Sequence, residues 1–514
     1  MGAPRLVVVM VVDQMRADYL DRFDILLTGG LGTFLESGVR FTEAHHRHAI
    51  TNTGPGHATI STGCDPARHG IITNYWLDRQ RGDEVYALDE GAPTRLECST
   101  LGDWLKSRYR DSKVYSVAGK DRSAVLLAGR EADGAYFYDW NGGFETSAYY
   151  SAESPAWLEN FNSESGLARR FGAAWTPQSL DRGEIEKLGV ETTDMGPLRS
   201  GFPHVFGGAS LFPGESFFNA LFTSPWLDAL VADLAIRMIE TEGLGADAVP
   251  DLLAVGFSAL DSAGHRYGPD SPEVLDTILA LDKTLDKFLG ELDQRIGLEH
   301  VLIALTSDHG AVQLPEVRQG RGLSGRRIGS EEILCLQGIE KRLDEKLAPS
   351  DWLRAGPVLN DSALEETGIA RTAAEAAVAE ALEACPSVAR AWTRGELLTV
   401  SGDEPQVGVA AAFARSYHPN RSPDVLIQWD EHFMPYPATA STHGSVYRYD
   451  TWVPMILMGA NLSPGWIETP AATTDLAPTL AGFAGVAPPD EIDGVDLGPS
   501  LADRKVVSQG KAGL

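Results

Sequence analysis

The sequence predicts an α/β fold with a doubly wound, mostly parallel central sheet, helices on both faces, and insertions that cover one edge of the sheet. Two observations predict it. Continuous runs of branched apolar residues, such as 5-RLVVVMVVD-13, are typical of strands buried on both faces of a parallel sheet. A long amphipathic segment separates two of these runs, as a crossover helix does in a strand–helix–strand unit.

Four apolar runs are the expected strands. They span residues 5–13, 251–261, 300–309 and 452–459. The fourth run follows shortly after His443. Acidic residues or a histidine end the first three runs: Asp13, Asp261, Asp308 and His309. In open α/β sheets, ligands bind beyond the carboxyl ends of the strands. We therefore expect these side chains to meet at that edge.

The segment 271–295 is the expected crossover helix. Pro272 stands near its start, and apolar residues recur at helical spacing: Val274, Ile278, Leu281, Leu285, Phe288 and Leu289. A second helix is expected over 372–385, and the tail 473–486 predicts a short helix before a proline-rich turn.

The chain has 514 residues, which exceeds one minimal core. We expect one domain over 1–514 with insertions at about 130–225 and 320–435, where the alternation of strands and helices breaks down. Both insertions are expected to cover the functional edge of the sheet. The sequence shows no internal repeat and no low-complexity tract.

The formal net charge of −29 argues against a nucleic acid or an anionic membrane surface as partner. Any anionic ligand would need metals or a few well-placed cations. No stretch is apolar and long enough to span a bilayer, and the apolar run 6–12 indicates a strand and not a signal peptide. The four cysteines are widely spaced, so their pairing stays open: Cys64, Cys98, Cys335 and Cys385.

The stretch 49-AITNTGPGHATISTG-63 predicts a helix that begins at Thr53, because proline suits the first helical turn. The unpaired N–H groups at such a helix start can hold a phosphoryl group or ease the ionisation of a hydroxyl. Taken alone, Thr53 is more readily an ordinary capping residue. The acidic residues and histidines elsewhere favour the chemical role.

Three carboxylates within ~4 Å of one another would repel by roughly 4 kcal/mol per pair at an effective dielectric near 20. Such a cluster needs cations, and mixed Asp and His ligands suit zinc. About six ligands favour two metal ions, a common apparatus for phosphoryl displacement. The alternatives are capping aspartates at strand ends and a surface pair Asp261/His265. A further cluster is interpreted as structural: His45, His46 and His48.

The pattern Val12-Asp13-Gln14, Thr53-Gly54-Pro55-Gly56-His57, 69-HGIITN-74, 261-DSAGH-265, 307-SDHG-310 and 442-THG-444 resembles the alkaline phosphatase superfamily. It is most similar to the branch shared by single-chain, threonine-nucleophile bacterial alkaline phosphatases and type I phosphodiesterase/nucleotide pyrophosphatases. The six motifs follow the family's order and cover nearly the whole chain. The tail 475–479 also resembles the family's closing helix.

The resemblance implies two zinc ions and a set of ligands for each. One ion would be held by Asp261, His265 and His443, and the other by Asp13, Asp308, His309 and the Thr53 hydroxyl. Asn74 would donate a hydrogen bond to a phosphoryl oxygen. The implied activity is hydrolysis of small phosphate monoesters to an alcohol and inorganic phosphate through a phosphothreonine on Thr53. The resemblance also implies a periplasmic or secreted protein whose signal peptide has been removed. We expect a monomer, with a homodimer as the alternative.

The segment 119-GKDRSAVLLAG-129 bears on which ester is cleaved. A monoester carries one more charged oxygen than a diester and needs one more cationic contact. Lys120 and Arg122, if extended, would project to the same side, and the segment resembles one in the threonine-type alkaline phosphatases. Gly54 stands where the diesterases tend to have Phe. We therefore expect a monoesterase. The alternatives are a phosphodiesterase/nucleotide pyrophosphatase, for which Lys120 and Arg122 are surface residues, and a metal-dependent phosphomutase.

Overall fold

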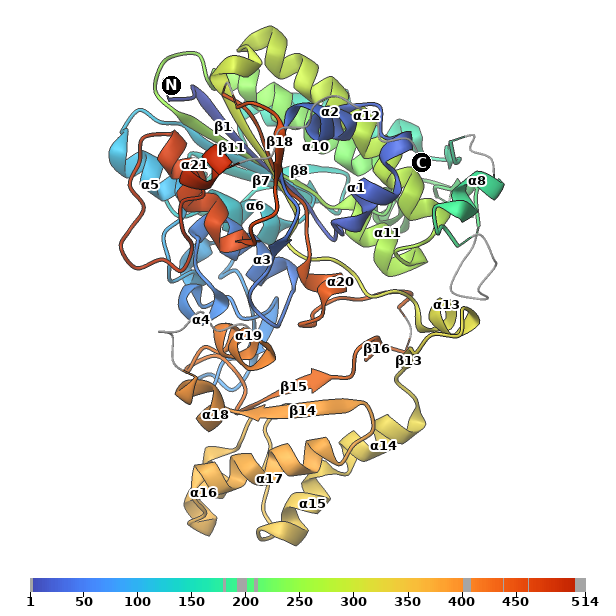
Figure 1. Cartoon of the computed structure of the whole chain (residues 1–514), viewed down its shortest axis with the longest axis vertical. Helices are drawn as coiled ribbons and strands as arrows, with labels where there is room; N and C mark the ends of the chain where they lie inside the picture. Colours follow the sequence, from blue (N-terminus) through green and yellow to red (C-terminus); the bar gives the residue numbers. More distant parts are fainter. Residues whose placement is uncertain are drawn as a thin grey trace.

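A computed structural model describes residues 3–178, 182–191, 201–207, 211–400, 408–437, 439–460 and 462–503. Within these residues a nine-stranded sheet has the order β18-β2-β17-β12-β1-β11-β6-β7-β8 (Figure 1). Its strands are β1 (Leu6–Val12), β2 (Val39–Phe41), β6 (Val114–Ala118), β7 (Gly134–Asp139), β8 (Gly143–Thr146), β11 (Asp251–Phe257), β12 (Val301–Thr306), β17 (Met455–Gly459) and β18 (Gly465–Ile467).

The sheet is mostly parallel, as the sequence predicts. The central strand β1 pairs in parallel with β11 on one side and with β12 on the other. Parallel pairing continues from β11 to β6 and β7. The predicted fourth strand, β17, runs antiparallel to β12, because an apolar run indicates burial on both faces and not direction.

Helices cover both faces of the sheet (Figure 1). Successive side chains of β1 point to opposite faces, so Val8 and Met10 join one core and Val7 and Val9 the other. The first core includes residues of α2 (Gly30–Ser37), α10 (Pro225–Glu242) and α12 (Pro272–Arg295). The second includes residues of α5 (Leu101–Arg108) and α21 (Leu476–Phe483). The fold is therefore doubly wound.

The predicted helices form close to their expected bounds. The crossover segment is α12, whose first turn is capped by Ser271 as its hydroxyl accepts a hydrogen bond from the Val274 N–H. Since β11 and β12 flank β1, this helix passes over the central strand. The segment 372–385 forms α17 (Arg371–Glu383), and the tail forms α21.

The first predicted insertion begins too early. Residues Gly134–Thr146 form β7 and β8, which extend the central sheet. The rest of the region, where the structure describes it, holds these elements: α7 (Ala156–Ser165), β9 (Ala174–Trp175), α8 (Arg182–Lys187), β10 (His204–Val205) and α9 (Glu215–Phe222). Residues 179–181, 192–200 and 208–210 of this prediction lie outside the described residues.

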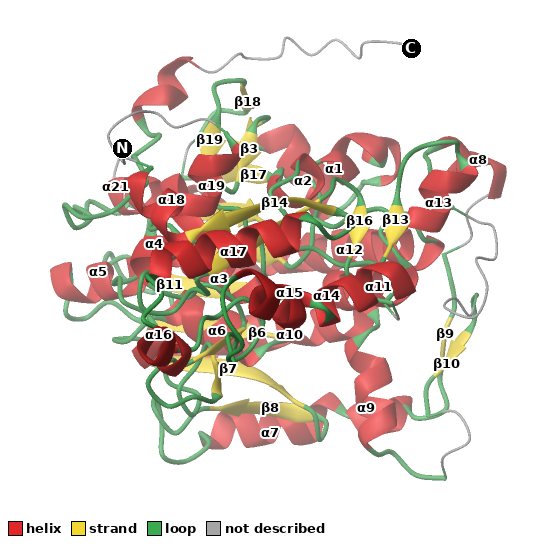
Figure 2. Ribbon diagram, turned by 90° about the horizontal axis from the view of Figure 1, so that it is seen from below, coloured by secondary structure: helices red, strands yellow, loops and turns green. Residues whose placement is uncertain are grey.

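The second predicted insertion has its own hydrophobic core, which encloses Trp352. Its main elements are α14 (Ser330–Gln337), α15 (Ile339–Lys346), α16 (Asp361–Thr367), α17, β14 (Val388–Thr393) and β15 (Val425–Trp429). Figures 1 and 2 show these elements stacked on the carboxyl-end side of the central sheet. We name residues 326–434 the cap. Residues 401–407 of it lie outside the described residues.

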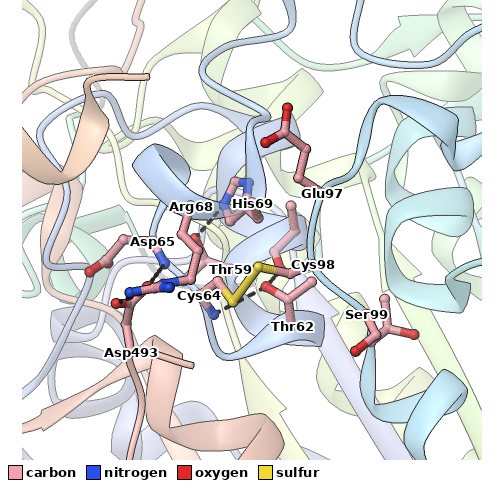
Figure 3. The surroundings of a disulfide bond; sticks show 12 residues. Thr59, Thr62, Cys64, Asp65, Arg68, His69, Glu97, Cys98, Ser99 and Asp493 are labelled. Carbon is pink, nitrogen blue, oxygen red and sulfur yellow. Dashed lines mark hydrogen bonds and ion pairs between the residues drawn. A yellow bond between two sulfur atoms is a disulfide. The ribbon is translucent and has the colours of Figure 1, made fainter. Parts of the chain in front are cut away.

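Two disulfides resolve the cysteine pairing that the sequence leaves open. Cys335 of α14 joins Cys385, directly after α17, inside the cap. Cys64, which follows α3 (Thr53–Thr62), joins Cys98 in the loop before α5 (Figure 3). No helix in the described part of the chain is long and apolar enough to cross a membrane.

The carboxylate of Asp282 in α12 caps the start of α2. Its Oδ2 accepts a hydrogen bond of 2.7 Å from the Gly29 N–H, and its Oδ1 accepts one of 2.7 Å from the Leu31 N–H. Two longer bonds come from the N–H groups of Thr28 and Gly32. One buried side chain thus satisfies the unpaired donors at a helix N-terminus.

We expect Asp282→Ala to lower the free energy of unfolding by about 3 kcal/mol, because buried N–H groups lose a charged acceptor. Urea denaturation measures the change. Asp286→Ala, an exposed aspartate one turn further along α12, is the control and should shift stability by less than about 0.5 kcal/mol. Equal losses in the two variants would contradict the capping role.

Candidate functional site

The structure brings the predicted acidic residues and histidines together beyond the carboxyl ends of the central strands. Asp13 directly follows β1, and Asp308 and His309 follow β12. Asp261 is not at a strand end as predicted, because β11 stops at Phe257 and Asp261 lies in the first turn of α11 (Ala259–Tyr267). His443 comes from the loop between β16 (Phe433–Met434) and α20 (Arg448–Thr451).

One group of three side chains has the spacing of metal ligands. The Asp261 Oδ1 lies 3.2 Å from the His265 Nε2 and 3.7 Å from the His443 Nε2. The helix α11 produces the first contact, since residues four apart lie on the same helix face. Ligands about 2.1 Å from a tetrahedral zinc ion are separated by roughly this distance. These three residues therefore offer one candidate metal site.

A second group surrounds His309. Its Nε2 lies 3.5 Å from the Asp13 Oδ1 and 3.4 Å from the Asp308 Oδ2. The atoms that come within reach of one ion belong to Asp13, Asp261 and His309. The Asp308 Oδ2 also lies 3.2 Å from the His57 Nδ1. This group contains Asp261 and lacks Asp308, so it differs in one carboxylate from the second set that the resemblance implies.

The three histidines of these two groups are oriented in the same way. Each Nδ1 donates to a backbone carbonyl: His265 to Ser441 at 2.9 Å, His443 to Thr51 at 2.8 Å, and His309 to Gly310 at 3.0 Å. A carbonyl only accepts, so the proton lies on Nδ1 and the lone pair on Nε2 faces the cluster. Metal-bound histidines are commonly held by such a partner.

Several buried atoms fit a cation. The Asp13 Oδ1, the Asp308 Oδ2 and the His309 Nε2 are buried and make no hydrogen bond within the described part of the chain. Leaving buried carboxylate oxygens without hydrogen bonds is costly unless a cation pairs with them. Oxygen and imidazole donors suit zinc and similar divalent ions. The residues present therefore fit the metal ions that the sequence predicts.

The pKa shifts show the strain among the carboxylates. Burial, together with repulsion from Asp261 and Asp308, raises the pKa of Asp13 well above its usual value. Burial also acts to raise the pKa of Asp261, but the neighbouring His265 and Lys120 outweigh it, and that pKa is lowered. One carboxylate thus resists ionisation while its neighbour is ionised, as expected for like charges that lack enough counter-charge.

Lys120 supplies part of that counter-charge. Its Nζ lies 2.5 Å from the Asp13 Oδ2 and 2.6 Å from the Asp261 Oδ2. Burial acts to lower the pKa of Lys120, but these two carboxylates outweigh burial and raise it. One ammonium group among three carboxylates leaves the cluster negative, which favours the binding of further cations.

Thr53 is the first residue of α3, where the sequence predicts the helix to begin. It is buried, and a side chain at Gly56 would place its Cβ 2.3 Å from the Asp308 backbone oxygen. The glycine therefore lets the start of α3 pack against the loop that carries Asp308 and His309. The Gly54 N–H donates to the Asn74 Oδ1 at 2.8 Å, which leaves the Asn74 NH₂ group to donate elsewhere.

The prediction that Lys120 and Arg122 lie on an extended segment is wrong. Lys120 is the N-cap of α6 (Asp121–Ala128), and Arg122 lies in its first turn. Their side chains contact different groups, since the Arg122 Nη1 donates to the Tyr86 hydroxyl at 3.4 Å. That hydroxyl donates in turn to the Asp121 carboxylate at 2.6 Å. Asp121, between these two residues, is the first residue of α6. The two-residue spacing of Lys120 and Arg122 does not indicate that a helix begins there.

Two further residues contact the cluster, Gln14 and His57. The sequence motifs contain both, but the sequence analysis assigns neither a role. Gln14, in a left-handed backbone conformation, donates from Nε2 to the Asp261 Oδ1 at 2.7 Å. His57 pairs with Asp308. His46, interpreted as structural, is buried and bonds the Ser307 carbonyl and the Thr473 hydroxyl. In the sequence, only their place in the same motifs as Asp13 and Thr53 indicates that Gln14 and His57 could belong to the site.

Residues 7–445 match the type I phosphodiesterase / nucleotide pyrophosphatase family. The chain belongs to this family. It is 29% identical to alkaline phosphatase PhoV of Synechococcus elongatus, over 95% of this chain and 91% of PhoV. It is 30% identical to alkaline phosphatase PhoD of Zymomonas mobilis, over 97% of this chain and 89% of PhoD.

The crystal structure of wild-type alkaline phosphatase PafA superposes with a TM-score of 0.86 at 27% identity, covering 97% of this chain and 99% of that one. The predicted resemblance and fold class are thereby confirmed. The similarity to several named alkaline phosphatases also supports the predicted enzyme class, a phosphoric monoester hydrolase.

We expect zinc added to the metal-free protein to raise its melting temperature, because an ion that binds only the folded state stabilises it by about 2.7 kcal/mol at a hundred times its Kd. Asp261→Asn should reduce the rise, since Asp261 stands in both candidate groups. Scanning calorimetry and bound-metal analysis measure the effect. His300→Gln, a half-exposed histidine outside both groups, is the control. An unchanged rise in Asp261→Asn would argue against this site.

Proposed function

We propose that the protein is a zinc-dependent alkaline phosphatase that hydrolyses phosphate monoesters through a phosphothreonine on Thr53. One observation carries the proposal: Thr53, which has a hydroxyl group, is the first residue of α3, and this helix packs through Gly56 against the loop of Asp308 and His309. A potential nucleophile, a helix N-terminus and a carboxylate–imidazole cluster thus adjoin one another. This combination suits attack on a phosphoryl group.

A solved variant of a relative supports the choice of residues. One matched structure is a PafA variant in which a threonine, an asparagine, a lysine and an arginine are replaced. The threonine and asparagine are as far apart in that sequence as Thr53 and Asn74 are here. The lysine and arginine are as far apart as Lys120 and Arg122. The same residue types at the same spacings are what a shared phosphoryl site would need.

The ligand sets in this proposal follow the resemblance. Asp261, His265 and His443 would hold one ion, and Asp13, Asp308, His309 and the Thr53 hydroxyl the other. Bound zinc lowers the pKa of a coordinated hydroxyl and stabilises charge on the oxygens of a phosphoryl group in transfer. The buried atoms without hydrogen bonds in the second set support its assignment.

The chain's own residues then carry the reaction. The Thr53 Oγ1 attacks phosphorus, the bond to the ester oxygen breaks, and the alcohol leaves with a proton. At the start of α3 the Gly54 N–H donates to Asn74 and the Gly56 N–H to the Asn52 carbonyl, so the Thr53 N–H and the positive end of the helix dipole would face the phosphoryl oxygens. Water next attacks the phosphothreonine, which restores the Thr53 hydroxyl and releases inorganic phosphate.

Asn74, Lys120 and Arg122 would bind the non-bridging oxygens. The Asn74 oxygen is engaged by Gly54, so its NH₂ group is the donor that remains. Lys120 is buried at the carboxylates and Arg122 is half-buried beside Tyr86, which argues against a solvated surface pair. Two cations placed near one dianion favour a monoester over a diester.

Two other features belong to the proposal. The two disulfides support a periplasmic or secreted location, since such bonds persist in oxidising compartments. We also propose that residues 1–514 form one catalytic domain that acts as a monomer, with a homodimer as the alternative. The cap would be the part of this domain that covers the site.

We expect Thr53→Ala to lower kcat by more than about 10⁴-fold, because the phosphothreonine can no longer form. Bound zinc should stay nearly unchanged, since three other ligands remain for each ion. Assay of an aryl phosphate and metal analysis of the same sample measure both. Near-normal activity in this variant would remove Thr53 from the mechanism.

The choice of ester is tested by kcat/KM for an aryl phosphate monoester and the matching diester. The wild type should favour the monoester, and Lys120→Ala/Arg122→Ala should lose about 10²-fold or more on the monoester with a smaller loss on the diester. A preference for the diester that the double variant leaves intact would indicate a phosphodiesterase. Release of no inorganic phosphate, with phosphate moved within the substrate, would indicate a phosphomutase.

A further inference from the structure

We propose that a pocket beside His443 binds the leaving group and selects phosphate monoesters of a neutral, single-ring alcohol. The inference rests on the proposed function and adds the substrate class to it. The pocket has a volume of about 120 Å³ and is lined from two sides, by the site loops and by the cap.

The position of the pocket suits a leaving group. Asn52, directly before Thr53, and His443 both line it. The His443 Nε2 faces Asp261, so His443 belongs to the ligand set that does not include Thr53. In two-metal phosphoryl transfer the leaving oxygen lies at the ion opposite the attacking oxygen. A substrate attacked by Thr53 would therefore direct its ester oxygen toward His443 and the rest of the alcohol into the pocket.

Four aromatic residues line the pocket, together with polar residues such as Asn52. Trp429, Phe433, Tyr436 and Tyr449 line it, and the Trp429 and Phe433 ring centroids lie 5.1 Å apart. The Tyr449 ring is fixed, since its hydroxyl accepts the His432 N–H at 3.2 Å and its face stacks on the His432 ring. Aromatic walls with a few polar groups are typical of sites for small ring compounds.

Size and charge restrict the occupant further. An apolar cavity of about 150 Å³ holds benzene, so about 120 Å³ has room for one ring and little more. Two acidic side chains line the pocket, Asp430 and Asp450, and none of its described lining residues is a lysine or an arginine. A leaving group with its own carboxylate or second phosphate would be repelled. The pocket therefore favours neutral rings.

Tyr436 is the residue to change. It is 53% exposed, so truncating it leaves the core intact. Trp429 is less suitable, because it also lines an apolar cavity of about 370 Å³ inside the cap, and its loss would disturb that core. The matched control is Tyr149→Ala, a tyrosine 42% exposed that does not line the pocket.

The kinetic test compares benzyl phosphate with ethyl phosphate, whose alcohols have similar basicity, so that the ratio of kcat/KM reports contact with the ring. We expect the wild type to favour benzyl phosphate by about tenfold or more. Tyr436→Ala should lower that preference by about 2- to 10-fold, and Tyr149→Ala should leave it unchanged. A 4-carboxybenzyl ester should be a poorer substrate than the benzyl ester in the wild type.

A binding test keeps this inference separate from the proposed function. Benzyl alcohol should give saturation-transfer NMR signals with the wild type and Tyr149→Ala, and weaker signals with Tyr436→Ala. If no ester is hydrolysed, the proposed function fails, and these signals alone decide whether the pocket binds a ring. Equal kcat/KM for the two esters, or binding that Tyr436→Ala leaves intact, overturns the pocket assignment.

Discussion

The mutual repulsion of three buried carboxylates is the constraint on which the site depends. Asp13 and Asp308 follow β1 and β12, Asp261 lies in the helix α11 after β11, and burial strengthens the repulsion among the three carboxylates. The chain relieves only part of it through Lys120. Three histidines stand around these carboxylates with Nε2 turned inward by backbone carbonyls. The arrangement therefore favours divalent ions at this candidate site, because they would offset the remaining negative charge.

The sheet order explains why this cluster needs most of the chain. The central strand β1 brings Asp13 between β11 and β12, so α11 and the loop after β12 deliver the other two carboxylates. His443 follows the cap in the sequence, and its Nδ1 donates to the carbonyl of Thr51, which precedes α3. The ligand sets therefore join residues hundreds of positions apart. The candidate site is therefore complete only when these distant segments are packed together.

Local patterns predicted the parts of the fold that depend on local interactions. Short continuous segments determine three of them: the apolar run of β1, the periodic apolar residues of α12 and the helix that begins at Thr53. The antiparallel direction of β17 and the membership of β7 and β8 in the sheet depend on partners distant in sequence. The helical setting of Lys120 and Arg122 follows from the N-cap geometry of α6. The contact of Gln14 with Asp261 could be found only in the structure, because an uncharged amide is not an obvious candidate for a metal or phosphate site.

The acidic character of the whole chain can now be reconciled with an anionic substrate. A net charge of −29 repels phosphate at long range, yet this field is screened within about 10 Å at ordinary ionic strength. Inside that distance the proposed phosphoryl site offers donors: the start of α3, the Asn74 NH₂ group, Lys120 and Arg122. In this proposal the carboxylates that line the pocket, Asp430 and Asp450, would act on the alcohol and not on the phosphate. Charge would thus be divided across the site, with one side suited to a dianion and the other to a neutral ring.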